Sequence, residues 1–190
     1  MSEDQLTPEE RIALLALARQ GLEFGVRGEP MPALALDELP ARFREPGATF
    51  VTLTKAGQLR GCIGTLEPYR SLADDAREHA IAAALNDYRF PRVQPEEISQ
   101  IDIEISRLTV PKPLEYDGPD DLLAKIRPGV DGLVVREGSR RATFLPQVWE
   151  KLPDPVDFLN HLCQKMGRQP DLWRRKQLEV EIYQVEEFHE

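Results

Sequence analysis

Cys62 stands in a short segment whose residue types suit chemistry. The stretch QLRGCIGTLEP places this cysteine two residues after Arg60 and within a pair of glycines, Gly61 and Gly64. A guanidinium near a thiol favours the thiolate, which attacks carbon or binds a soft metal. Glycines leave the neighbouring amides accessible to an oxyanion or a carboxylate. Arg60 and Cys62 are therefore candidate catalytic residues, and Gly61 and Gly64 are candidate ligand-binding residues.

The spacing also predicts how these side chains point. In a strand, Arg60 and Cys62 project to one face, about 6.5 to 7 Å apart. We expect both to line one cavity, while Leu59 and Ile63 pack in the core. A structural explanation of the same residues stays open, because strand glycines also permit close helix packing and a small cysteine can fill a gap.

Further candidate ligand-binding residues lie in three other segments. In NDYRFP, Asp87 and Arg89 are two residues apart and can either hold each other or clamp a ligand carboxylate. Glu104 lies on the polar side of the alternating segment IDIEIS, and Gln147 follows a proline in TFLPQVWE. The structural alternatives are a loop salt bridge and an ordinary solvated strand face.

The remaining cysteine and histidines are weaker candidates. Cys163 lies on the apolar stripe of a helix pattern, which predicts a packing role. His79 and His161 are expected at the edges of helices, and whether either approaches Cys62 is open. No CxxC or histidine-rich spacing occurs, so we expect reduced thiols, no bound metal and no cofactor.

The composition is that of an ordinary globular protein. Of the 190 residues, 41% are hydrophobic and 30% are charged, and the net charge is -9. This charge repels phosphate backbones and anionic lipid, so we expect no role on nucleic acid or at a membrane. The apolar run after the acidic N-terminus is soon interrupted by charge, which predicts neither a signal peptide nor a spanning helix, and hence a cytoplasmic protein.

The first half of the chain supplies the elements that position Cys62. The sequence TPEE from Thr7 predicts a capping box and a helix from Pro8 to about Gly21. The stretch ATFVTLTKAGQLRGCIG predicts a hairpin that turns at Ala56-Gly57, with the cysteine on its second strand. A helix that ends near Asn86 and the strand QIDIEISRLTV follow.

The second half loosely repeats this order. The stretch GLVVREGSRRATFL predicts a hairpin, an amphipathic helix follows, and QLEVEIYQV predicts a closing strand. We therefore predict an α+β fold with a mostly antiparallel sheet flanked by helices and a cryptic hairpin-helix-strand duplication. A barrel-like sheet is one option. No independent linker is evident, so residues 1–190 are predicted to be a single domain, with two lobes as an option.

Four motifs carry a resemblance to a known family. LRGCIGTLEP, NDYRFPRV, IDIEIS and ATFLPQVWE occur in this order, and nearly the whole chain resembles the AMMECR family, named for the Alport syndrome and elliptocytosis chromosomal region. Its bacterial members are called AmmeMemoRadiSam system protein A. The resemblance implies two lobes around a cleft near LRGCIG, with the motif residues from Leu59 to Gly64 all present here.

The family does not supply a reaction, so two hypotheses remain. The resemblance implies association with a Memo-like protein and a radical-SAM protein, which suggests a modification pathway. In the first hypothesis the protein is a small enzyme: Cys62 is the reactive or ligand-contacting thiol, Arg60 poises it, and Arg89, Glu104 and Gln147 bind the ligand. In the second, the same cleft is a non-catalytic recognition module for a peptide or partner protein.

Overall fold

The first helix, α1 (Pro8–Arg27), confirms the capping box predicted at its start. The Thr7 hydroxyl accepts a hydrogen bond from the Glu10 N–H, and the Thr7 N–H donates to the Glu10 carboxylate. The helix continues beyond its predicted end because Gly21 packs against another helix instead of ending this one. A Cβ at Gly21 would lie 2.6 Å from the Arg77 carbonyl oxygen.

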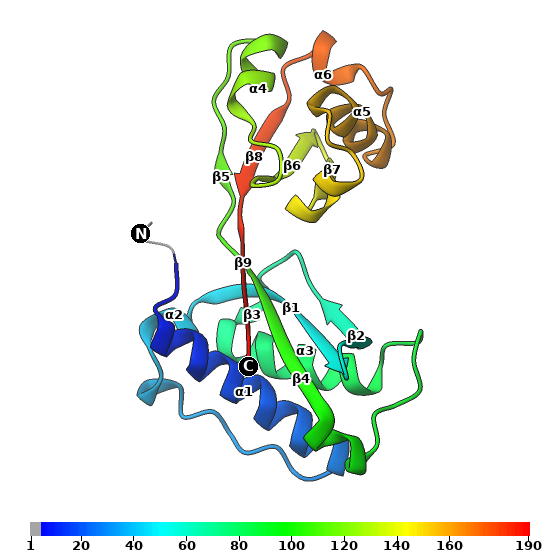
Figure 1. Ribbon diagram of the computed structural model, residues 1–190. Helices are drawn as coiled ribbons and strands as arrows, with labels where there is room; N and C mark the ends of the chain where they lie inside the picture. Colours follow the sequence, from blue (N-terminus) through cyan, green and yellow to red (C-terminus); the bar gives the residue numbers. More distant parts are fainter. Residues whose placement is uncertain (1–4) are drawn as a thin grey trace. The chain divides into compact units, whose positions relative to one another are not determined.

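The computed structural model describes residues 5–190 and shows two compact units (Figure 1). The described residues up to Thr109, together with Glu186–Glu190, form unit 1, and Val110–Val185 form unit 2. Unit 1 is therefore built from two separate segments of the chain, with unit 2 inserted between them in sequence.

Unit 1 has one sheet with the strand order β2-β1-β4-β9, and the short strand β3 pairs with β1. The hairpin between β1 and β2 turns at Ala56 and Gly57, as predicted, and both residues have positive φ. Besides α1, its elements are η1 (Leu36–Glu38), α2 (Ala41–Arg44), β1 (Pro46–Lys55), β2 (Gln58–Gly64), β3 (Arg70–Ser71), α3 (Leu72–Leu85), η2 (Pro95–Gln100), β4 (Ile101–Leu108) and β9 (Val185–His189).

The two faces of this sheet differ in chemistry. On one face Val51, Ile103 and Ile105 are fully buried and pack with apolar residues of α1 and α3. The strand register places the alternate residues on the opposite face. We call this opposite face the polar face, and its polar side chains are Thr52, Thr54, Cys62, Asp102, Glu104 and Ser106.

Unit 2 has a second sheet, with the strand order β5-β8-β6-β7. Its core contains Phe158, Trp173 and Leu133, all buried. Its elements are β5 (Lys112–Pro113), α4 (Pro119–Lys125), β6 (Gly132–Glu137), β7 (Arg140–Phe144), η3 (Pro146–Glu150), α5 (Pro155–Lys165), α6 (Leu172–Arg175) and β8 (Glu179–Tyr183).

The same hairpin-helix-strand order occurs in both units. In unit 1 the hairpin β1-β2 is followed by α3 and by β4, which pairs antiparallel with β1. In unit 2 the hairpin β6-β7 is followed by α5 and by β8, which pairs antiparallel with β6. The predicted α+β class and the repeated order are therefore confirmed. The barrel-like alternative is wrong, because within residues 5–190 each sheet is an open path of strands.

Candidate functional site

Cys62 lies on the polar face of unit 1, in a row that crosses three strands. The register pairs it with Thr52 on β1, and Thr52 in turn pairs with Glu104 on β4. The Thr52 hydroxyl donates a hydrogen bond to Cys62 Sγ over 3.3 Å. All three residues are half-buried. A thiol, a hydroxyl and a carboxylate thus form a polar row, which we call the Cys62 row.

The backbone of Cys62 is held by an ion pair from the loop that follows α3. The Cys62 N–H donates to Asp87 Oδ2 over 2.8 Å, and the Cys62 carbonyl oxygen accepts from Arg89 Nη2 over 3.2 Å. Asp87 is only 5% exposed and lies 2.6 Å from the Arg89 guanidinium. The hydrogen bonds from Arg89, and that from the Cys62 N–H, hold the pKa of Asp87 well below its usual range. The carboxyl group is therefore ionised at neutral pH.

These contacts cover the free edge of the sheet. β2 pairs with β1 on one side only, and it ends the strand order of unit 1. Because the backbone groups of Cys62 bond to loop side chains, they point away from β1, and Asp87 and Arg89 stand in for a neighbouring strand. The sequence predicts that Asp87 and Arg89 either pair with each other or clamp a ligand carboxylate. In the structure the two side chains pair with each other. The amide expected to bind a ligand carboxylate binds Asp87 instead.

A bulge in β2 changes the predicted alternation around Arg60. The register pairs Leu53 with Gly61 and Thr54 with Leu59, which leaves Arg60 without a partner residue on β1. The extra residue shifts Leu59 to the polar face, where it is 44% exposed. The prediction that Leu59 packs in the core is therefore wrong.

Arg60 is bound to Glu97 of η2. Its guanidinium donates to the two Glu97 carboxylate oxygens over 3.2 and 2.9 Å, and to the Pro91 carbonyl oxygen over 2.7 Å. Arg60, the Gln94 N–H and Lys55 lower the pKa of Glu97 to about 2. Arg60 is thus engaged in fastening η2 to β2. A cavity shared by this guanidinium and the thiol stays a prediction.

Gly61 and Gly64 have packing roles in the structure. A Cβ at Gly61 would lie 2.1 Å from the carbonyl oxygen of Ala83 in α3, so the missing side chain lets the helix backbone approach the strand. A Cβ at Gly64 would lie 2.4 Å from the Phe50 ring, and Gly64 does not have positive φ. Close packing thus accounts for both glycines, and a ligand-binding role for them stays a prediction. Ile63, as predicted, packs against the core.

Gln147 belongs to unit 2, on the 3-10 helix η3, where it is exposed. The nearby Trp149 is 3% exposed, stacks on Phe158 with ring centroids 3.7 Å apart, and donates its indole N–H to the Asp131 carbonyl oxygen. The segment around Gln147 is therefore anchored by packing. A ligand-binding role for Gln147 stays a prediction.

Neither His79 nor His161 contacts the Cys62 thiol among the interactions of the described residues. His79 is buried on the helix-covered face, where its Nδ1 lies 3.1 Å from Asp75 Oδ2 and 3.3 Å from the Thr49 hydroxyl. Because both Asp75 and Thr49 meet the same ring nitrogen, this cluster does not have the arrangement of a catalytic triad. His161 is exposed and bonds to its own helix, whereas Cys163 is fully buried, as predicted.

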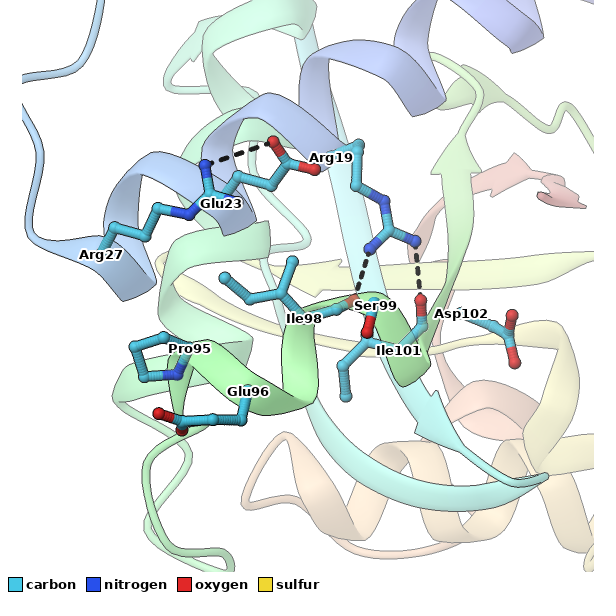
Figure 2. Close-up of a pocket in the computed structure, with 9 residues that line it drawn as sticks. All are labelled: Arg19, Glu23, Arg27, Pro95, Glu96, Ile98, Ser99, Ile101 and Asp102. Atoms are coloured by element: carbon cyan, nitrogen blue, oxygen red, sulfur yellow. Dashed lines mark hydrogen bonds and ion pairs between the residues drawn. The ribbon is translucent and has the colours of Figure 1, made fainter.

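A cavity of about 490 Å³ lies elsewhere on unit 1. Figure 2 shows Arg19 in its wall, with the guanidinium donating to the carbonyl oxygens of Ile98 and Ile101. Glu23 and Arg27 line the same cavity from α1. It contains no member of the Cys62 row. Among residues 5–190, no group of three or more histidine, cysteine or acidic side chains is placed to hold a metal ion.

Two residues of the site, Thr52 and Glu97, are absent from the prediction. A two-residue turn at Ala56-Gly57 pairs Cys62 with Val51, and only the bulge at Arg60 shifts the register so that Thr52 lies opposite Cys62. Glu97 lies in the segment PEEISQ, and nothing in the local sequence indicates that it binds Arg60. The first residue depends on the bulge. The second depends on tertiary structure.

Comparison with known proteins gives consistent matches. The AMMECR1 family matches residues 15–188. A protein from Methanothermobacter thermautotrophicus is 44% identical over 97% of this chain and 96% of its own length. A protein from Methanopyrus kandleri is 40% identical over 98% of this chain and 91% of its own length. The crystal structure of an uncharacterized protein from Pyrococcus horikoshii is 33% identical, covers 97% of this chain and 93% of that chain, and superposes with a TM-score of 0.74.

Within residues 5–190, no helix combines the length and the apolar character that crossing a membrane requires.

Proposed function

This chain belongs to the AMMECR1 family, and we propose that the polar face of its unit 1 is a recognition site centred on the Cys62 row. In this proposal Cys62, Thr52 and Glu104 contact the bound molecule, and no covalent bond is made or broken. The bound molecule is a peptide or a segment of a partner protein.

The observation that carries the proposal is the clamp on the Cys62 backbone. Both backbone polar groups of this residue are bound by Asp87 and Arg89, and its thiol is held by Thr52. The side chain is half-buried and lies on the polar face. An ion pair with a buried carboxylate therefore fixes the position of one small side chain, which is the arrangement that precise contact with a ligand requires.

The charged groups around the motif favour recognition over catalysis. Glu97 and Asp87 have lowered pKa values, so neither accepts a proton readily near neutral pH. Their partners Arg60 and Arg89 are engaged in the same ion pairs. Arg60, the residue predicted to poise the thiol, has its guanidinium hydrogen-bonded to Glu97 and to the Pro91 carbonyl oxygen.

The half-exposed thiol is the observation that favours the second candidate, a small enzyme with Cys62 as nucleophile. Labelling with iodoacetamide separates the two functions, because Cys163 is fully buried and the native protein reports on Cys62 alone. For a recognition site we expect Cys62 to label near neutral pH no faster than free cysteine does under the same conditions. Fast labelling near neutral pH would favour the enzyme.

Protection of the same thiol tests the recognition site directly. We expect a protein fraction of the cell extract to slow the labelling of Cys62 in the wild-type protein. Glu104→Gln should lose this protection, whereas Glu96→Gln, an exposed change of equal charge on η2, should keep it. Equal protection of both variants would contradict the proposal. The association with Memo-like and radical-SAM proteins, which the family resemblance implies, would make those proteins the first purified partners to test.

A further inference from the structure

Charge is unevenly divided between the two units. The sequence segments 1–109 and 186–190, which contain unit 1, hold 12 basic and 21 acidic residues, whereas the segment 110–185 holds 12 of each. The net charge of -9 therefore belongs to the unit 1 segments. Within the balanced unit 2, positions 165–176 carry five basic residues and a single acidic one.

Three cations of unit 2 gather near one carboxylate. Glu137, at the end of β6, lies 2.5 Å from Arg168 Nε and 2.8 Å from Lys176 Nζ. Arg140 pairs with Glu137 across the hairpin turn and donates to the Gly167 carbonyl oxygen over 3.5 Å. The hydrogen bond from Lys176 and the charge of Arg168 lower the pKa of Glu137. One carboxylate thus pairs with two cations, and a third cation belongs to its partner residue in the hairpin.

Two exposed arginines of α6, Arg174 and Arg175, directly precede Lys176 in the sequence. The Arg174 guanidinium lies 4.5 Å from the ring centre of Trp173, and Arg175 pairs with Asp171. We call the whole surface the basic patch, and its cations are Arg140, Arg168, Arg174, Arg175 and Lys176. All five are exposed, and with Glu137 and Asp171 counted the patch has an excess of three positive charges.

The cations of the basic patch are held in place. Gly167 has a φ of 77°, and a Cβ there would lie 2.7 Å from Arg140 Nη1, so the glycine makes room for the guanidinium. Arg168 and Lys176 are fixed by Glu137. The dipole of α5 places partial negative charge at its C-terminal end, which accounts for the position of Arg140 beside the Gly167 carbonyl oxygen. It does not account for the arginines of α6. Cations that are already ordered lose less entropy when a partner binds.

An acidic polypeptide fits this surface better than a nucleic acid does. Duplex DNA carries a charge about every 1.7 Å, roughly twice the density of an extended peptide with one carboxylate per residue, so Glu137 and Asp171 within the patch repel it more strongly. Single strands also need aromatic stacking platforms, but Trp173 is only 1% exposed. The more widely spaced carboxylates of a peptide can pair with separate guanidinium groups.

We propose that the basic patch of unit 2 binds an acidic polypeptide segment of a partner protein. The proposal is independent of the function of the Cys62 row. A fluorescein-labelled oligoglutamate, added to the full chain, is the probe, and fluorescence anisotropy gives its Kd. Arg140→Gln with Arg174→Gln removes two charges that have no carboxylate partner among the described residues. Lys112→Gln with Lys151→Gln removes two exposed charges from the same unit outside the patch.

We expect the patch variant to weaken oligoglutamate binding about fivefold and the control variant to change it less than twofold, with both effects shrinking as salt rises. Equal weakening by both variants would overturn the proposal, as would an absence of salt-dependent binding by the wild-type chain. Tighter binding of an oligouridylate of the same charge would assign the patch to RNA and also overturn it. Thermal unfolding of each variant establishes that the comparison is made between folded proteins.

Discussion

Replacing Gly61 by alanine separates packing from ligand binding at the motif. The added Cβ would lie 2.1 Å from the Ala83 carbonyl oxygen, whereas an ordinary carbon-oxygen contact is about 3.3 Å. β2 and α3 must therefore move apart by about 1 Å. Overpacking of a core costs about 1 to 3 kcal/mol, and a clash with helix backbone belongs in the upper half of this range. For a chain of this size we expect Tm to fall by about 4 to 12 °C.

Scanning calorimetry of the purified variant measures this change. Leu59→Ala is the control on the same strand, and we expect it to leave Tm almost unchanged because Leu59 is 44% exposed. The double variant Gly61→Ala with Ala83→Gly should not recover stability, because the clash is with the Ala83 carbonyl oxygen and not with its side chain. An unchanged Tm for Gly61→Ala would refute the packing explanation and restore the ligand-binding one.

Three further predictions follow from the ion pairs of unit 1. Asp87→Ala leaves the Cys62 N–H and Arg89 without their acceptor, so we expect a loss of about 1 to 3 kcal/mol by urea unfolding and more association of the exposed edge by light scattering. Because folding lowers the pKa of Asp87, its stabilisation is present above about pH 4 and is lost as pH falls toward the folded value, so Asp87→Asn should flatten the acid limb of a Tm-against-pH curve. Deleting residues 186–190 removes Glu186 from the buried Arg107, and we expect a loss of about 3 kcal/mol or more by urea unfolding.

The local elements of the site could be predicted from the sequence because their signals are local. The capping box at Thr7 and the turn at Ala56-Gly57 each depend on a few adjacent residues, and both are present. The hairpin placed Cys62 on the correct strand, and the second hairpin revealed the repeated order of elements. Local chemistry thus predicted which segment carries the site.

The partners of each charged residue could not be predicted in the same way. A single extra residue in β2 turned Leu59 outward, and the bulge has no sequence signal that alternation alone detects. Arg60 is two residues from Cys62 in sequence, but its guanidinium pairs with Glu97, which comes from a distant loop. Arg107 likewise occupies an inward position of β4 because Glu186 neutralises it. Spacing along a strand therefore says little about which charges meet.

The repeated topology allows one more argument about the Cys62 row. In unit 2 the equivalent row consists of Thr143, Val134 and Glu181. Here Val134 is 1% exposed, and the Thr143 hydroxyl is hydrogen-bonded to the hydroxyl of Tyr183, whose ring lies where a Cβ of Gly132 would be. Burial raises the pKa of Tyr183 to about 12, so this hydroxyl remains a hydrogen-bond donor. The Thr143 hydroxyl of this row is thus closed off by a tyrosine, whereas Glu181, like Glu104, is half-buried. The two rows therefore differ in the thiol of Cys62 and in the hydroxyl of Thr52, where unit 2 has the buried Val134. Under the proposed function, we expect the bound segment to contact these two groups.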